Sequence, residues 1–292
     1  KDVVAAYDAV QGTAAARPIY SATSFNGSPS LTFAGVDDQL SIAGFNFVSG
    51  AISAGLWIKP YSMGEGGIGS FLCSARVGST NSEWRFEFVG TNGFRYYRET
   101  SGTPDCLARS VDNVIPIGEW SFVAFTFSSG GTNLNRARIY LNGIQVPYAS
   151  LTTGAGNATV DTLERTYIGS FGDGSGVFDG EMAYVQCFNR VISQNEIIQM
   201  MRYPGSDQRS LELFLTLKYA GNKEWDYSNR IKKAVTIVGT TQGTSEPPIH
   251  GLFLPTIPKR NLFVGTVIPP APPPPSTDTG RRRLKTLLGV GL

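Results

Sequence analysis

Two carboxylates on one strand face are the residues whose spacing in this chain most suits acid–base chemistry. Glu83 and Glu87 are four positions apart in a segment of alternating polar and aromatic residues, so both would leave an extended strand on the same side. Enzymes that cleave polysaccharides use two such carboxylates, one of them as a proton donor. Arg85 stands between the two here and favours an ion-paired outer face instead. We therefore expect no glycosidase activity.

Other catalytic arrangements are also missing from the sequence. The single histidine, His250, lies in a proline-rich tract, where no scaffold would hold it rigidly against a nucleophile. The glycine-rich segments 64–69 and 172–176 lack the Lys-Ser/Thr that follows in phosphate-binding loops. No Cys-x-x-Cys or Cys/His spacing indicates zinc. We predict that the protein is not an enzyme.

Aromatic and polar residues in two neighbouring segments suit carbohydrate binding, which needs aromatic platforms beside hydrogen-bonding groups. We place the sugar contacts at Tyr96, Arg98 and Trp84. Trp84 alternates with Phe86 and Phe88, however, and three aromatic residues on one strand face are also typical of a core. For Trp84, a sugar platform and a core position stay open as alternatives.

Short alternating segments separated by turn residues fill most of the chain, and one segment looks helical. Ser193 with Glu196 three residues later forms a capping box that would open a helix at residues 194–202. Asn142-Gly143 marks a tight hairpin. The segments expected as strands are 31–42 (two strands and a turn), 51–60, 70–76, 83–89, 94–99, 117–127, 138–146, 167–170, 181–188, 211–219 and 234–241. This pattern predicts an all-β fold, a two-sheet antiparallel sandwich with one short helix.

Five motifs occur in the order seen in a known family. They are the strand–Gly-Val-Asp-Asp–strand hairpin with the NGSPSL phrase before it, AISAGLWIKP at 51–60, GEW at 118–120, FDG at 178–180, and Phe188-Asn189-Arg190 followed by the capped helix. Over residues 25–203 the chain resembles laminin-G-like domains of the concanavalin A-like lectin/glucanase type. The resemblance implies a jelly roll. The family usually has an acidic residue where Ala34 stands.

Calcium is the cofactor that the resemblance suggests. Laminin-G-like and pentraxin-like sandwiches often bind it at a sheet rim through loop carboxylates, which suit a hard cation. Asp37 and Asp38 also lie in a turn, where Asp is common for its backbone hydrogen bonds alone, so a structural role is the alternative. By motif position, the candidate ligands are Asp37, Asp38, Asp173 and Asp179.

The composition changes at residue 246. We expect one jelly roll over residues 1–245, with 211–245 as a hairpin that completes the sheets, and an extended arm over 246–292. Ten of the seventeen prolines lie in this arm, and a polyproline tract cannot build a core. Such an arm needs neighbours to order it, so we expect contacts with other subunits of an assembly. The arm residues that would make them are Pro269, Pro270, Arg281, Arg282, Arg283 and Lys285.

The net charge and the hydropathy restrict the expected partners further. The net charge of +2 gives no reason to expect nucleic acid, and a short basic terminus more often solubilises a chain or docks on an acidic neighbour. No apolar run long enough for a membrane-spanning helix occurs.

Cys187 alternates into an apolar face and should be buried. Cys73 and Cys106 are expected either to pair or to remain as two thiols.

The sequence leads to two functional hypotheses. The first is a non-catalytic structural or decoration protein of a large assembly such as a virion, with a lectin-like domain on the virion surface and the arm as its anchor. The alternative is a secreted or cell-surface lectin, calcium-dependent or not, whose jelly roll binds carbohydrate. Both place the protein outside the cell and without a membrane segment.

Overall fold

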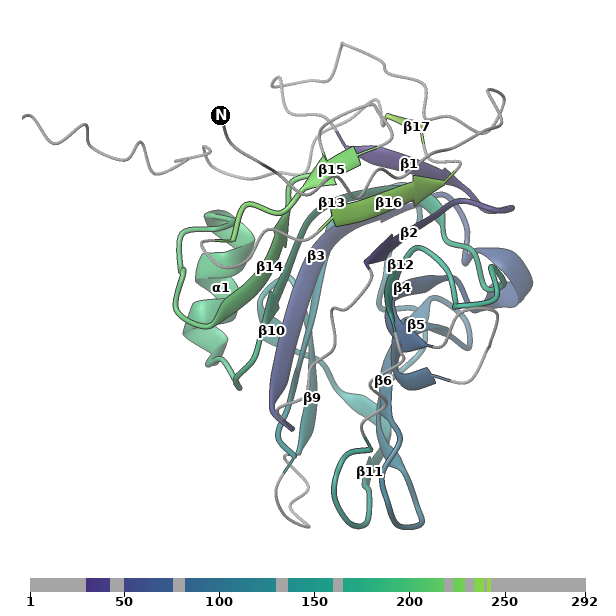
Figure 1. Ribbon diagram of the computed structural model, residues 1–292. Coiled ribbons are helices and arrows are strands. Elements are labelled where there is room, and N and C mark those ends of the chain that lie inside the picture. Colours follow the sequence, from purple (N-terminus) through teal and green to yellow (C-terminus); the bar gives the residue numbers. More distant parts are fainter. Residues whose placement is uncertain are drawn as a thin grey trace, which may run out of the picture. The chain divides into compact units, whose positions relative to one another are not determined.

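Short strands, several of them buried along nearly their whole length, build two antiparallel sheets (Figure 1). The computed structural model describes residues 30–42, 50–75, 82–129, 136–159, 165–217, 223–228, 234–238 and 241–242. All of them belong to the unit Lys1–Leu254, and the second unit, Pro255–Leu292, lies outside the described residues. The expected boundary at residue 245 and the arm residues Pro269 to Lys285 also fall outside them.

The first sheet has eight strands within the described part of the chain. In spatial order they are β10 (Ile144–Gln145), β9 (Ala137–Leu141), β8 (Ser121–Phe127), β3 (Ile52–Pro60), β13 (Asp179–Phe188), β1 (Leu31–Ala34) and β17 (Thr241–Gln242), with β14 (Leu211–Leu215) also paired to β13. The hairpin between β9 and β10 turns at Asn142-Gly143, and both residues have positive φ, as predicted.

The second sheet has nine strands over the same described ranges. Their order is β11 (Tyr148–Thr153), β7 (Cys106–Ser110), β6 (Gly93–Arg98), β5 (Ser82–Val89), β4 (Ser70–Ala75), β12 (Arg165–Ile168), β2 (Gln39–Ile42), β16 (Ala234–Val238) and β15 (Lys223–Trp225). The late strands add to both sheets, because β14 pairs with β13 and β16 pairs with β2. The two strands expected to pair as one hairpin therefore lie in different sheets, and the hairpin forms between β15 and β16.

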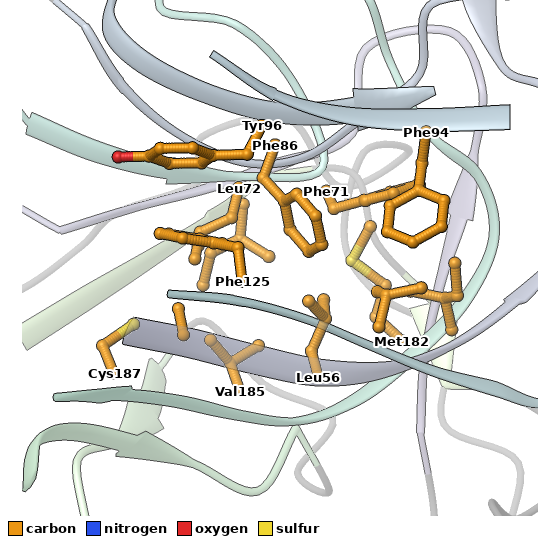
Figure 2. Close-up of a cluster of buried hydrophobic side chains, with 14 of the residues drawn as sticks. Leu56, Phe71, Leu72, Phe86, Phe94, Tyr96, Phe125, Met182, Val185 and Cys187 are labelled. Atoms are coloured by element: carbon orange, nitrogen blue, oxygen red, sulfur yellow. The ribbon is translucent and has the colours of Figure 1, made fainter. Parts of the chain in front are cut away.

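Aromatic side chains from both sheets fill the space between them (Figure 2). The rings of Tyr96 and Phe125 stack with their centroids 4.1 Å apart, and Phe86 lies 5.1 Å from Phe125. Phe71 meets Phe86 edge-on at 5.4 Å. Offset and edge-to-face contacts of this kind stabilise a core beyond the area they bury. These contacts determine which face of each of these strands points into the core.

The short helix α1 (Gln194–Arg202) packs on the outer face of the first sheet (Figure 1). Its predicted capping box is present, because Ser193 and Glu196 bond each other's backbone N–H groups. The Arg190 guanidinium, 2.7 Å from Glu196, holds the pKa of that carboxyl at about 2. Ile197 and Met200 point toward the sheet and are buried. A single 3₁₀ turn, Glu65–Gly67, is the other helical piece of the described residues.

These observations confirm the predicted all-β fold, two antiparallel sheets of a jelly-roll sandwich with one short α-helix. Cys73, Cys106 and Cys187 are buried and form no disulfide. Cys73 lies on β4 and Cys106 on β7, with β5 and β6 between them in the sheet. Of the two alternatives, the structure therefore has two thiols and no disulfide.

A substitution at Gly169, where the glycine-rich loop leaves β12, tests the packing of this loop against Phe33. A Cβ at Gly169 would lie 2.1 Å from the Phe33 ring, whereas a Cβ at Gly174 would meet nothing within 4 Å, and both residues have positive φ. We expect Gly169→Ala to lose ~1–3 kcal/mol more in the free energy of unfolding than Gly174→Ala, because only the first adds overpacking to backbone strain. Chemical denaturation of the two variants measures this difference. Equal losses would contradict the described contact with Phe33.

The pH dependence of stability tests the burial of Asp38 in the turn between β1 and β2. Its side chain is 2% exposed and accepts a hydrogen bond from the Ala34 backbone N–H. Burial raises the pKa of Asp38 from 3.8 to about 7. The folded protein therefore binds this proton more tightly than the unfolded chain does. The stabilisation that follows from binding this proton is present below about pH 4 and is lost as the pH rises through about 7.

We expect the free energy of unfolding to fall by up to about 1.4 kcal/mol per pH unit in that window, and Asp38→Asn to abolish this slope. The matched control is Asp37→Asn in the same turn. It removes only the weaker repulsion that Asp37 exerts on Asp38, so it should keep most of the slope. Denaturant titrations at several pH values measure both. An unchanged slope in Asp38→Asn would disprove the assignment.

Candidate functional site

The three residues predicted to contact a sugar lie inside the sandwich. Trp84 and Tyr96 are 0% exposed and Arg98 is 1% exposed. Figure 2 shows Tyr96 among the core side chains, next to Phe86 and Phe125. A side chain enclosed in this way offers no surface to a sugar. The prediction of sugar contacts at these three residues is therefore wrong, and the core alternative for Trp84 is the correct one.

The outer face of the same two strands carries a different set of side chains. Arg85 and Glu87 alternate with the buried aromatics of β5, and Arg95 and Tyr97 do the same on β6. The register places Arg85 opposite Tyr97 and Glu87 opposite Arg95. We call these four residues, Arg85, Glu87, Arg95 and Tyr97, the β5–β6 face.

Arg85 is held between two aromatic rings. Its Cζ lies 4.8 Å from the centroid of the Tyr97 ring and 5.8 Å from that of Phe171. The Tyr97 hydroxyl donates a 2.6 Å hydrogen bond to Asp105 Oδ2, which fixes the ring. Burial, together with this bond to Asp105, raises the pKa of Tyr97 to about 12, so the hydroxyl keeps its proton at neutral pH. The ring nevertheless remains partly exposed.

Glu87 forms the charged part of the face. Its side chain is fully buried, and Arg95 approaches Oε1 with Nη2 at 2.6 Å and Nε at 2.7 Å. Oε2 is buried without a hydrogen-bond partner. Burial raises the pKa of Glu87, and the guanidiniums of Arg95 and Arg85 act against that shift. Glu83 has a different neighbour, Arg98, whose Nη2 lies 4.0 Å from Oε2. The two carboxylates are thus each beside an arginine.

The glycine-rich loop after β12 closes one side of the face. Phe171 from this loop packs with Cys73, Ala75 and Tyr167 in a small buried cluster on the outer side of the second sheet. The register runs from Tyr167 through Cys73 to Arg85 and on to Tyr97. Arg85 therefore stands where this apolar cluster meets the partly exposed Tyr97. The contact between Phe171 and Arg85 joins residues far apart in the chain, so no local sequence signal indicated it.

The four aspartates predicted as calcium ligands do not form a metal cluster. Asp38 is turned inward, and Asp173 Oδ1 accepts hydrogen bonds from the Ser175 N–H at 3.0 Å and its hydroxyl at 2.7 Å. Asp37 is exposed and Asp179 begins β13. No group of three or more His, Cys, Asp or Glu that could hold a metal occurs within the described ranges. Calcium binding stays a prediction.

Comparison with known proteins identifies the family but no characterised close relative. Residues 34–198 match the family model described as the concanavalin A-like lectin/glucanases superfamily. A search of curated proteins found no match. In the described part of the chain, no helix is long and apolar enough to span a membrane.

Solved structures with this fold come from several organisms. A candidate carbohydrate-binding protein from Bacteroides ovatus ATCC 8483 is 18% identical with a TM-score of 0.54, over 76% of this chain and 61% of that one. The heptameric SAP-like pentraxin of Limulus polyphemus is 13% identical over 72% of this chain and 94% of its own, with a TM-score of 0.46. The CBM40 of a Ruminococcus gnavus IT-sialidase, bound to α2,3-sialyllactose, is 13% identical over 59% and 95%, with a TM-score of 0.41.

The chain thus spans less than two thirds of the Bacteroides ovatus protein, and at 18% identity that likeness concerns the fold alone. The family model, in contrast, covers more than half of this chain, from the turn between β1 and β2 into the capped helix α1. The predicted resemblance is confirmed: the protein belongs to the concanavalin A-like lectin/glucanase superfamily.

Proposed function

We propose that the protein is a non-catalytic carbohydrate-binding module whose ligand binds on the β5–β6 face. The observation that carries the proposal is the pairing of the partly exposed Tyr97 ring with the Arg85 guanidinium beside it. A sugar can lay its C–H surface on an aromatic ring while its hydroxyls bond to neighbouring polar groups. Family membership and the fold shared with a candidate carbohydrate-binding protein support this choice.

The bonding partners of the buried carboxylates Glu87 and Glu181 support a site that binds a sugar without cleaving it. Glu87 accepts a hydrogen bond from Arg95 Nε and forms an ion pair with the same guanidinium. In the first sheet, the fully buried Glu181 accepts from Ser30 Oγ at 2.6 Å, Tyr61 OH at 2.7 Å and Lys59 Nζ at 3.3 Å. Glycoside hydrolysis needs two carboxylates on either side of one bond, with one carrying a proton to donate. Each of these carboxylates is instead occupied by donors from its own surroundings.

Alanine substitutions on the β5–β6 face test the site. On a glycan array, we expect Tyr97→Ala and Arg85→Ala to bind the best wild-type ligand about tenfold more weakly or worse, because each removes one side of the stacked pair. The matched control is Tyr203→Ala, since Tyr203 is also exposed, at 43%, and follows α1 on the first-sheet side. It should bind as wild type does. Loss of binding in Tyr203→Ala alone, or no glycan binding by the wild type, would disprove the proposal.

The sequence of residues 246–292 supports a second role, as the anchor of this module in a larger assembly such as a virion. Its proline-rich composition is suited to threading across neighbouring subunits, and its basic end to docking on acidic surfaces. We expect a chain lacking residues 246–292 to bind glycans normally but to be lost from the assembled particle in sedimentation. Normal incorporation of the truncated chain would rule out the anchoring role.

A further inference from the structure

Arg85 is the one cation of the β5–β6 face that the protein leaves without an acceptor. Within the described part of the chain it makes no hydrogen bond and no ion pair, and its Nε is buried without a partner. A guanidinium carries several N–H donors and is charged at all physiological pH values. Leaving the buried Nε–H donor unpaired costs free energy. An incoming acceptor would recover it.

Arg95 on β6 and Arg109 on β7 are each paired with a carboxylate. Arg95 is paired with Glu87 at 2.6 Å, and Arg109 with Asp112 at 3.1 Å. The strand neighbours of Arg85 are Cys73 on β4 and Tyr97 on β6, and burial raises the pKa of the Tyr97 hydroxyl, so it stays neutral. The nearby carboxylate of Glu87 interacts electrostatically with Arg85 but is bonded to Arg95, so the N–H donors of Arg85 stay open to a ligand.

A second positive charge lies on the same side of the second sheet. Arg165 is two residues from Tyr167 on β12, which places both side chains on the outer face. Arg165 is partly exposed and makes no ion pair with any described residue. It increases the attraction of this face for an anion without itself touching Arg85 in the register of the sheet.

The two rings that hold Arg85 also prepare it for binding. Stacking between Tyr97 and Phe171 restricts the guanidinium before a ligand arrives, so less side-chain entropy is lost on binding. A planar guanidinium matches a carboxylate, with which it can form two parallel hydrogen bonds. The partly exposed Tyr97 ring next to it can carry the sugar ring to which that carboxylate is attached.

We infer that the ligand is an acidic saccharide whose carboxylate binds to Arg85 while its sugar ring rests against Tyr97. This inference rests on the proposed carbohydrate-binding function and adds the chemical class of the ligand.

The test compares carboxylated saccharides with their own methyl esters, which keep the sugar and remove the charge. The probes are oligogalacturonate, a hyaluronan oligosaccharide and sialyllactose, each as acid and as ester, measured by calorimetry with the full-length protein. We expect at least one acid to bind about tenfold or more tightly than its ester, and Arg85→Gln to lose that difference. The matched control is Arg109→Gln, which removes the same charge from the same face but from an arginine that already has a partner.

Each outcome decides one of the two claims. Equal binding of acid and ester, or tighter binding of sulfated heparin than of every carboxylated probe, overturns the carboxylate inference and leaves carbohydrate binding intact. A preference for acids that survives Arg85→Gln, or that disappears equally in Arg109→Gln, overturns the assignment to Arg85. No binding of any saccharide overturns the proposed function itself. If Arg85→Gln fails to fold, the acid–ester comparison on the wild type still decides the ligand class.

Discussion

The aromatic residues of β5 hold the second sheet in one register, and the rest of the proposed site depends on that. Trp84, Phe86 and Phe88 all point into the core, where Phe125 lies within 5.6 Å of Trp84 and 5.1 Å of Phe86. A slip by one residue would move these rings into water and bring Arg85 and Glu87 into the core. Burying two charged groups there without their partners costs far more than the slip could return.

The two sheets have unlike outer faces as a consequence. On the first sheet, α1 brings Ile197 and Met200 onto Phe122 and Phe188, so that this part of the face is a second apolar core. On the second sheet, the apolar cluster described on the outer face is small, Phe171 with Cys73, Ala75 and Tyr167, and Tyr97 near it stays partly exposed. Figure 1 shows α1 on one side of the sandwich and β5 and β6 on the other. The proposed ligand face is on the side that the helix does not cover.

Local motifs made the fold predictable from the sequence. The capping box at Ser193, the Asn142-Gly143 turn and the FDG entry into β13 each act over a few residues, so their structure follows from their own chemistry. At Gly180 of that FDG turn, a side chain would meet the Lys59 carbonyl oxygen at 2.3 Å. The pairing of the strands was harder to predict than the local motifs, because no local sequence signal indicates that β14 and β16 join different sheets.

The predicted sugar contacts fell on buried positions for a definite reason. Tyr96 and Arg98 were chosen by residue type, although the alternation of Trp84, Phe86 and Phe88 already indicated which face of β5 is buried. The register that pairs Phe86 with Tyr96 carries that choice to β6 and turns Tyr97 outward. Register between strands, and the approach of Phe171 from a distant loop, are set by tertiary packing and could not be predicted from one sequence.

The central claim is that a saccharide binds on the outer face of β5 and β6. The most direct measurement is a ¹H–¹⁵N NMR titration of the protein with its best-binding saccharide. We predict that the shifted signals will centre on the backbone amides of Arg85 and Tyr97 and on the Arg85 side-chain Nε–H, with β3 and β8 unchanged. Shifts that centre on the first sheet, with the Arg85 signals unmoved, would contradict the account.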